Sequence, residues 1–316
     1  MFSAKSIVSK TCKLIFWCMS YCTVCICPLK ADSYVTVCKE GNQLGGQLTT
    51  YAVILGYAWS NGLQPYFSKE FLLSRPGGFT NYEYIFHRLP QQLSSEINTN
   101  PARHFGYYGG RDPIPYYGDN VCICGMPDYP LPYFQPHRKR IRELFGPSPE
   151  VIEELRAKYA AIIDHPKTVA VHIRAYHPSL SIHRNLGKDY YERAMKQFSN
   201  DHLFVVFSDR IGWCKDHLDF QGKSVVFIEG NKHVQDLYLM SLCKNIITAN
   251  STFSWWAAYL KKDEQGVILV PSKWFPDENP NYRKTFYPPH YTIFPVDKIP
   301  PQNWNVANYS TTSLGD

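Results

Sequence analysis

Between residues 169 and 270, short apolar runs rich in β-branched side chains alternate with segments of helical periodicity. The expected strands are residues 169–174, 203–207, 224–228, 245–248 and 267–270, and the expected helices are 188–198, 211–218, 234–243 and 252–261. Strands that alternate with helices of this length pair in parallel through right-handed crossovers. The pattern predicts an α/β fold, with a doubly wound sheet covered by helices on both faces.

An earlier strand and helix are also expected. Residues 34–39 (YVTVCK) predict a strand, residues 40–46 a glycine loop, and the spacing of apolar residues from Leu48 to Trp59 a helix. Residues 61–119 are rich in Pro, Gly and Tyr and predict irregular loops. A further helix is expected to begin at Ser148, a good N-cap. A chain of 316 residues favours two modest domains.

The N-terminus resembles an export signal. Lys5, Lys10 and Lys13 precede the apolar run 14–29, which is short for a membrane-spanning helix. A cleaved signal peptide and a signal-anchor that tethers the chain to a membrane through residues 14–29 both fit residues 1–31. The lysines favour an N-in orientation if the run is an anchor.

Charge and cysteine spacing exclude some function classes. The 33 Lys and Arg against 27 Asp and Glu give a mild net charge of +6, which argues against a nucleic-acid binder. Cys122-Ile-Cys124 is too tight for a zinc pair, so no metal site is expected. Disulfides are possible among the cysteines after the N-terminal run, at positions 38, 122, 124, 214 and 243.

Polar residues follow three of the expected strands. His172 and Arg174 end the first strand, and Ser208 with Asp209 follows the second. Ligands of open α/β sheets bind beyond the carboxyl ends of the strands, and arginine matches phosphate oxygens with a fork of donors. An internal salt bridge with a core histidine, and a helix cap at Ser208, are the competing interpretations.

The third strand end carries Asn250, Ser251, Thr252 and Phe253 at an expected helix start. Hydroxyls and backbone N–H groups clustered there form an anion cradle without the lysine of a P-loop. A plain N-cap at Ser251 or Thr252 is the alternative.

The order of these segments resembles a known family. VAVHIR, FVVFSDRIGWCK and DLYLMSLCKNIITANSTFSWWAAYL look like the donor-binding half of the α-1,2-fucosyltransferases, glycosyltransferase family 11, over residues 168–271. Residues 44–52 are similar to the family's glycine loop. The resemblance implies a GT-B-like fold of two Rossmann-like lobes with a donor-binding cleft between them. An acceptor-side lobe would cover residues 32–164, a nucleotide-sugar-binding lobe 165–275, and a Pro-rich tail 276–316.

The implied activity is inverting transfer of L-fucose from GDP-fucose to a hydroxyl of a glycan acceptor, O2 of galactose, without a metal or a permanently bound cofactor. Arg174 would stabilise the charge on the leaving GDP. The resemblance places the other donor-binding positions at Gly45, Gly46, His172, Ser208, Asp209, Asp236, Asn250, Ser251, Thr252 and Phe253. Among these positions, the resemblance implies that Asp209 and Asp236 bear on the nucleoside.

The chain departs from the family pattern near the expected reaction centre. Ala175 and His177 stand where the family motif has Arg and Asp, and Arg210 replaces a frequent Asp. His177 could serve as the general base. An impaired glycan- or nucleotide-binding relative and a transferase of another nucleotide-sugar are the alternatives.

The donor requirement limits the expected location. A transferase of this type needs its nucleotide-sugar in the same compartment, which indicates a membrane-associated or secretory enzyme. The compartment would be a Golgi-type lumen in a eukaryote or the cytoplasmic face of the inner membrane in a bacterium. No sequence pattern indicates an oligomeric state.

Overall fold

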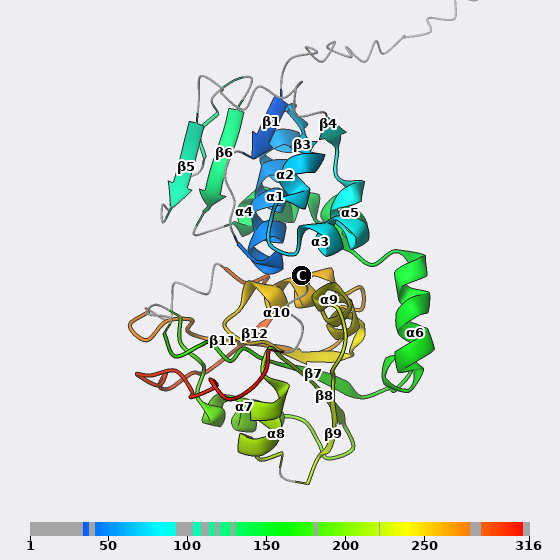
Figure 1. The fold of residues 1–316 in the computed structure, drawn as a ribbon, viewed down its shortest axis with the longest axis vertical. Helices are drawn as coiled ribbons and strands as arrows, with labels where there is room; N and C mark the ends of the chain where they lie inside the picture. The colour runs from blue at the N-terminus through cyan, green and yellow to red at the C-terminus, as the bar shows by residue number, and fades with distance from the viewer. Residues whose placement is uncertain are drawn as a thin grey trace, which may run out of the picture. The chain divides into compact units, whose positions relative to one another are not determined.

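Two parallel β-sheets organise the chain in the computed structural model (Figure 1). The structure describes residues 34–37, 42–92, 104–108, 114–116, 118, 121–127, 130–179, 183–220, 222–278 and 286–311. Within these ranges, no helix combines the length and apolarity needed to cross a membrane. The expected signal or anchor, residues 1–31, lies outside the described residues.

The larger sheet has six strands in the order β12-β11-β10-β7-β8-β9, and all of their pairings are parallel. They are β7 (Thr168–Ile173), β8 (Leu203–Ser208), β9 (Ser224–Phe227), β10 (Asn245–Ile247), β11 (Ile268–Pro271) and β12 (Thr292–Phe294). The first strand, β7, lies in the middle, and the chain order reverses between β7 and β10. Doubly wound sheets of this order bind ligands where the order reverses.

Helices cover both faces of this sheet. Val169, Val171 and Ile173 of β7 pack in one hydrophobic cluster with α7 (Lys188–Met195) and α8 (Ile211–His217). Ala170 belongs to a second cluster with α9 (His233–Leu242) and α10 (Thr252–Leu260). Successive side chains of a strand point to opposite faces, so the two clusters lie on opposite sides. The predicted α/β fold with parallel strands is confirmed, and the expected elements from residue 169 to 270 end within a few residues of the observed ones.

The smaller sheet has the order β2-β1-β6-β5 and is also parallel. Its strands are β1 (Tyr34–Val37), β2 (Gln64–Pro65), β5 (His104–Tyr108) and β6 (Val121–Met126), while β3 (Phe67–Ser68) pairs with β4 (Gln91–Gln92). The helices of this part are α1 (Leu44–Ser60), α2 (Lys69–Leu73), α3 (Gly78–Tyr84), α4 (Leu131–Phe134) and α5 (Arg138–Phe145), with single 3₁₀ turns at Phe86–Arg88 and Gln135–His137.

The prediction of irregular loops over residues 61–119 was wrong, because these residues contain β2 to β5, α2 and α3. Strands of two residues are too short to produce a period, and β5, whose sequence is HFGYY, contains no β-branched residue. By contrast, α6 (Pro149–Ile163) begins where expected, with the Ser148 hydroxyl accepting a hydrogen bond from the Val151 N–H at 3.5 Å.

The glycine loop expected at residues 40–46 was wrong at its end, because Gly45 and Gly46 lie in the first turn of α1. Both positions are too crowded for a larger residue. A Cβ atom on Gly45 would lie 2.6 Å from the Phe253 nitrogen, and one on Gly46 would lie 2.4 Å from Cβ of Asn42. The glycines therefore provide close packing within and around a helix.

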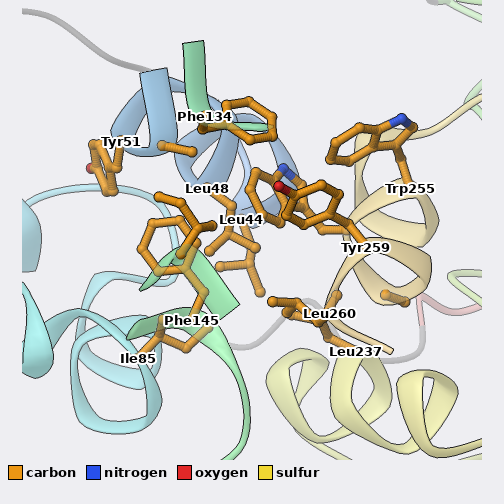
Figure 2. Packing of buried hydrophobic residues seen from close by; sticks show 14 of the residues in the cluster. Leu44, Leu48, Tyr51, Ile85, Phe134, Phe145, Leu237, Trp255, Tyr259 and Leu260 are labelled. Carbon is orange, nitrogen blue, oxygen red and sulfur yellow. The ribbon is translucent and has the colours of Figure 1, made fainter. Parts of the chain in front are cut away.

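A shared hydrophobic core joins the two sheets. Figure 2 shows Leu44 and Leu48 of α1 close to Tyr259 and Leu260 of α10. Phe134 stacks on Trp256 with ring centroids 5.4 Å apart, and large aromatic side chains dominate the burial energy of such a core. Residues 32–316 form one compact unit, so the expected division into lobes at residue 164 stays a prediction.

Candidate functional site

The sheet order brings the three polar strand ends together. β7 lies between β10 and β8, with Ile173 opposite Ser208 and Val171 opposite Ile247. Arg174, Asp209 and the residues after β10 therefore leave the sheet at the same edge. This edge is also the point where the strand order reverses.

Arg174 is held by the carboxylate of Asp209. Its Nη1 lies 2.8 Å from Oδ2 of Asp209, and the other carboxylate oxygen accepts the Ala175 N–H at 2.9 Å. The Arg174 side chain is 30% exposed. The ion pair therefore orients the guanidinium. The part of the guanidinium that faces solvent can bind a second anion. The expected contact of Asp209 with a nucleoside stays a prediction.

Tyr176 is a site residue that sequence reasoning missed. The Arg174 guanidinium lies 5.2 Å from the centre of its ring, and its hydroxyl donates to the backbone oxygen of Asn250 at 3.0 Å. Burial raises the pKa of Tyr176 to about 12, so the hydroxyl keeps its proton. Tyr176 thus links the end of β7 to the end of β10. In a tyrosine-rich chain, its position alone gave no signal.

His172 is buried beside the start of α10. Its ring centroid lies 5.4 Å from that of Phe253. Burial, and secondarily the Arg174 charge, lowers the pKa of His172 to about 3, so the ring is neutral near pH 7. Its Nδ1 is buried and has no hydrogen-bond partner among the described residues, which marks it as a group that a ligand can engage. His172 can therefore contribute hydrogen bonding but no positive charge.

Two helix N-termini meet at this edge. Ser251 caps α10, its hydroxyl accepting the Phe253 N–H at 3.3 Å, as the N-cap interpretation expected. Gly45, in the first turn of α1, lies against Thr252 and Phe253. Neither helix has an acidic residue in its first turn. The positive ends of two helix dipoles thus converge without a carboxylate to neutralise them, which favours an anion.

The remaining strand-end residues have mainly structural contacts. Asn250 donates from its side chain to the backbone oxygens of Arg184 and Trp274, at 2.8 and 2.9 Å. The Ser208 hydroxyl accepts the Arg210 N–H at 3.0 Å. These residues shape the edge of the sheet, and their binding to a ligand stays a prediction.

Asp236 and His177 make different contacts from the residues described above. Asp236 is buried in the first turn of α9, where it accepts a hydrogen bond of 2.9 Å from the Asn231 side chain. His177 is exposed, and its Nδ1 lies 2.8 Å from the Ser179 hydroxyl. Their predicted roles, at the nucleoside and as general base, remain predictions.

Cysteine and metal chemistry take no visible part in the site. No group of three or more His, Cys, Asp or Glu side chains that could hold a metal ion occurs in the described part of the chain. Cys214 and Cys243 are buried free thiols, and burial raises the pKa of each to about 12. Cys122 and Cys124 are disulfide-bonded.

Comparison with known proteins agrees with this picture. The model of the family described as glycosyl transferase family 11 matches residues 121–292, more than half of the chain. An α-1,2-colitosyltransferase of Escherichia coli is 38% identical over 161 residues, which are 47% of this chain and 54% of that protein. Human galactoside α-(1,2)-fucosyltransferase 1 is 26% identical over 259 residues, 74% of this chain and 67% of that protein.

The chain spans about half the length of the colitosyltransferase. Among solved structures, the fucosyltransferase NodZ from Bradyrhizobium has a TM-score of 0.46 at 13% identity, covering 72% of this chain and 92% of its own. The resemblance that the sequence motifs predicted is confirmed by the family match, which includes all site residues except Gly45 and Gly46.

Proposed function

Because this chain belongs to glycosyl transferase family 11, we propose that it transfers L-fucose from GDP-fucose to a hydroxyl of a galactose-containing glycan. The acceptor hydroxyl is O2 of galactose, and the anomeric configuration inverts. The name of the human relative, a galactoside α-(1,2)-fucosyltransferase, supports this acceptor and position.

One observation carries the proposal. A half-buried arginine and two helix N-termini free of first-turn acids converge where the strand order of a doubly wound sheet reverses. A diphosphate is the anion that such an arrangement suits, since it offers several oxygens to N–H donors and the arginine fork. His172, neutral and unpartnered at Nδ1, supplies a hydrogen bond beside it.

The chemistry follows from this placement. The acceptor oxygen attacks the anomeric carbon of fucose, the bond from that carbon to the phosphate oxygen breaks, and GDP leaves with the electron pair. Arg174 and the start of α10 stabilise the negative charge that develops on GDP. The acceptor's proton passes to His177, the proposed general base. Asp236 and Asp209 contribute to the nucleoside side of the site.

Transfer from GDP-fucose to a panel of galactosides tests the proposal. The wild-type chain should form a fucosylated product in step with GDP release, and Arg174→Ala should lower kcat by about 100-fold or more, the usual cost of losing a charge-stabilising donor. Arg156→Ala is the matched control, because Arg156 forms an exposed ion pair with Asp164 on α6. Equal turnover by wild type and Arg174→Ala would refute the role of Arg174.

His177→Gln separates binding from catalysis in the same assay. The substitution should leave the KM for GDP-fucose near that of wild type and lower kcat, because a glutamine cannot take the proton. An unchanged kcat would remove His177 from the mechanism and leave the donor site intact.

The same assay should include a second donor. The colitosyltransferase is 38% identical to this chain over 161 residues, so a colitosyl nucleotide is the alternative donor. Comparing kcat/KM for the two donors with one acceptor decides between them. A higher value for the colitosyl donor would replace fucose in the proposal and leave the diphosphate site unchanged.

A further inference from the structure

The segment after β12 packs beside the proposed donor site, although it lies beyond the family match, which ends at residue 292. Val296, Ile299 and Val306 are buried in the cluster that covers the α7 and α8 face of the sheet. This segment, residues 295–311, is drawn in red in Figure 1. It is therefore part of the folded core, and the site has a neighbour that the family comparison does not include.

One side chain of this segment holds the loop that follows β7. The Asn303 Oδ1 accepts the Asn185 N–H at 2.8 Å. Its Nδ2 donates to the backbone oxygens of His177, at 3.1 Å, and His183, at 2.9 Å. The amide thus joins both ends of the loop between β7 and α7, of which residues 174–179 and 183–187 are described.

The loop passes this restraint on to the donor site. The Asn185 side chain accepts the Tyr176 backbone N–H and donates to the Tyr176 backbone oxygen at 3.3 Å. Tyr176 in turn reaches the backbone oxygen of Asn250 through its hydroxyl and lies beneath the guanidinium of Arg174. Asn303 is thus connected through two hydrogen-bonded residues, Asn185 and Tyr176, to Asn250, where the proposed anion cradle begins.

The position of Asn303 is itself fixed from outside the site. The next residue, Trp304, stacks on Trp213 of α8 with ring centroids 4.1 Å apart and planes 10° apart. Farther along, the Tyr309 hydroxyl donates to Asp216 at 2.9 Å. Both contact partners lie on α8. Packing therefore orients the Asn303 amide without the need for a bound donor.

We infer that Asn303 is a positioning residue for donor binding: its amide fixes the loop after β7 and thereby sets Tyr176, Arg174 and His177. This inference rests on the proposed function for the identity of the ligand. It predicts a loss of donor affinity when the amide is changed, even though Asn303 belongs to a segment outside the family match.

The test measures GDP affinity by calorimetry for wild type, Asn303→Ala, Asn303→Asp and Asn305→Ala. Removing hydrogen bonds that together contribute about 1.4 kcal/mol should weaken GDP binding about tenfold in Asn303→Ala. Asn303→Asp should bind at least as weakly, because its second oxygen faces the two carbonyls. Asn305→Ala is the control, because the Asn305 side chain is exposed and accepts a hydrogen bond from the nearby Ala307 N–H, and it should stay within about twofold of wild type.

Amide hydrogen exchange supplies a readout that needs no ligand. Exchange should become faster at residues 174–187 in Asn303→Ala and stay unchanged in the core strand β8. Uniformly faster exchange would indicate loss of global stability and overturn the positioning role.

The outcomes separate the two proposals. If wild type binds GDP and Asn303→Ala binds it equally well, the positioning inference fails alone. If wild type does not bind GDP, the proposed function fails, and the exchange measurement still decides whether Asn303 restrains the loop.

Discussion

At the scale of single residues, the site depends on which groups carry charge. Of His172 and Arg174, which end the first predicted strand, only Arg174 brings a positive charge, because burial keeps His172 neutral. The Asp209 carboxylate neutralises this charge less than an unshared carboxylate would, because it also accepts the Ala175 N–H. The ion pair orients the guanidinium while leaving part of it exposed.

The buried His172 predicts a pH dependence of stability. An unfolded histidine titrates near pH 6.5, whereas the folded pKa is about 3. Its contribution to stability is therefore complete above pH 6.5 and is lost as the pH falls toward 3, because the unfolded chain binds the proton first. Between pH 6.5 and pH 5 this amounts to about 2 kcal/mol of unfolding free energy.

Urea unfolding at the two pH values measures this effect. His172→Gln should lose about 2 kcal/mol less than wild type over that interval, because glutamine does not titrate. His87→Gln, a histidine substitution at an exposed position, is the matched control. Parallel curves for wild type and His172→Gln would show that the imidazole is not buried in its neutral form.

At the scale of elements, the sequence predicted the strands and helices from 169 to 270 because apolar runs rich in β-branched residues alternate with segments of helical periodicity. It could not predict that Arg174 pairs with Asp209, since that contact depends on β7 lying beside β8 in register. The first turn of α1 was mistaken for a loop for a similar reason. Gly45 is required by a contact with Phe253, which lies more than two hundred residues away.

Gly45→Ala tests the meeting of α1 and α10. A Cβ atom would lie 2.6 Å from the backbone nitrogen of Phe253, which cannot move without shifting α10. We expect a loss of about 1–3 kcal/mol in unfolding free energy, typical of overpacking, together with weaker GDP binding.

The control for this substitution is Gly187→Ala, where the nearest atom would lie at an ordinary distance of 3.6 Å. Chemical denaturation and GDP titration of both variants provide the comparison. Wild-type stability and affinity in Gly45→Ala would mean that the two helix starts lie farther apart than described.

At the scale of the whole molecule, a buried hydrogen bond helps to join the two sheets. The Trp256 Nε1–H donates to the Thr49 hydroxyl at 2.8 Å, and this hydroxyl donates to the Gly45 oxygen at 2.9 Å. The bond links α10 to α1 close to the proposed anion cradle, residues 250–253. Stability and site geometry are therefore coupled through Thr49.

Thr49→Val should lower the unfolding free energy by about 1–3 kcal/mol, because it leaves the buried Trp256 N–H without an acceptor. Thr50→Val is a close control: its hydroxyl is buried and has no hydrogen-bond partner in the described part of the chain, so the substitution should be neutral or stabilising. Equal unfolding free energies for the two variants would contradict the coupling.

The central claim is that a diphosphate binds where β7 and β10 end. Calorimetric titration with GDP and with guanosine tests it most directly, since the two ligands differ only in the diphosphate. The account predicts that wild type binds GDP at least about tenfold more tightly than guanosine, and that Arg174→Ala removes most of this difference. Equal affinity for the two ligands, or a preference for GDP that survives Arg174→Ala unchanged, would contradict it.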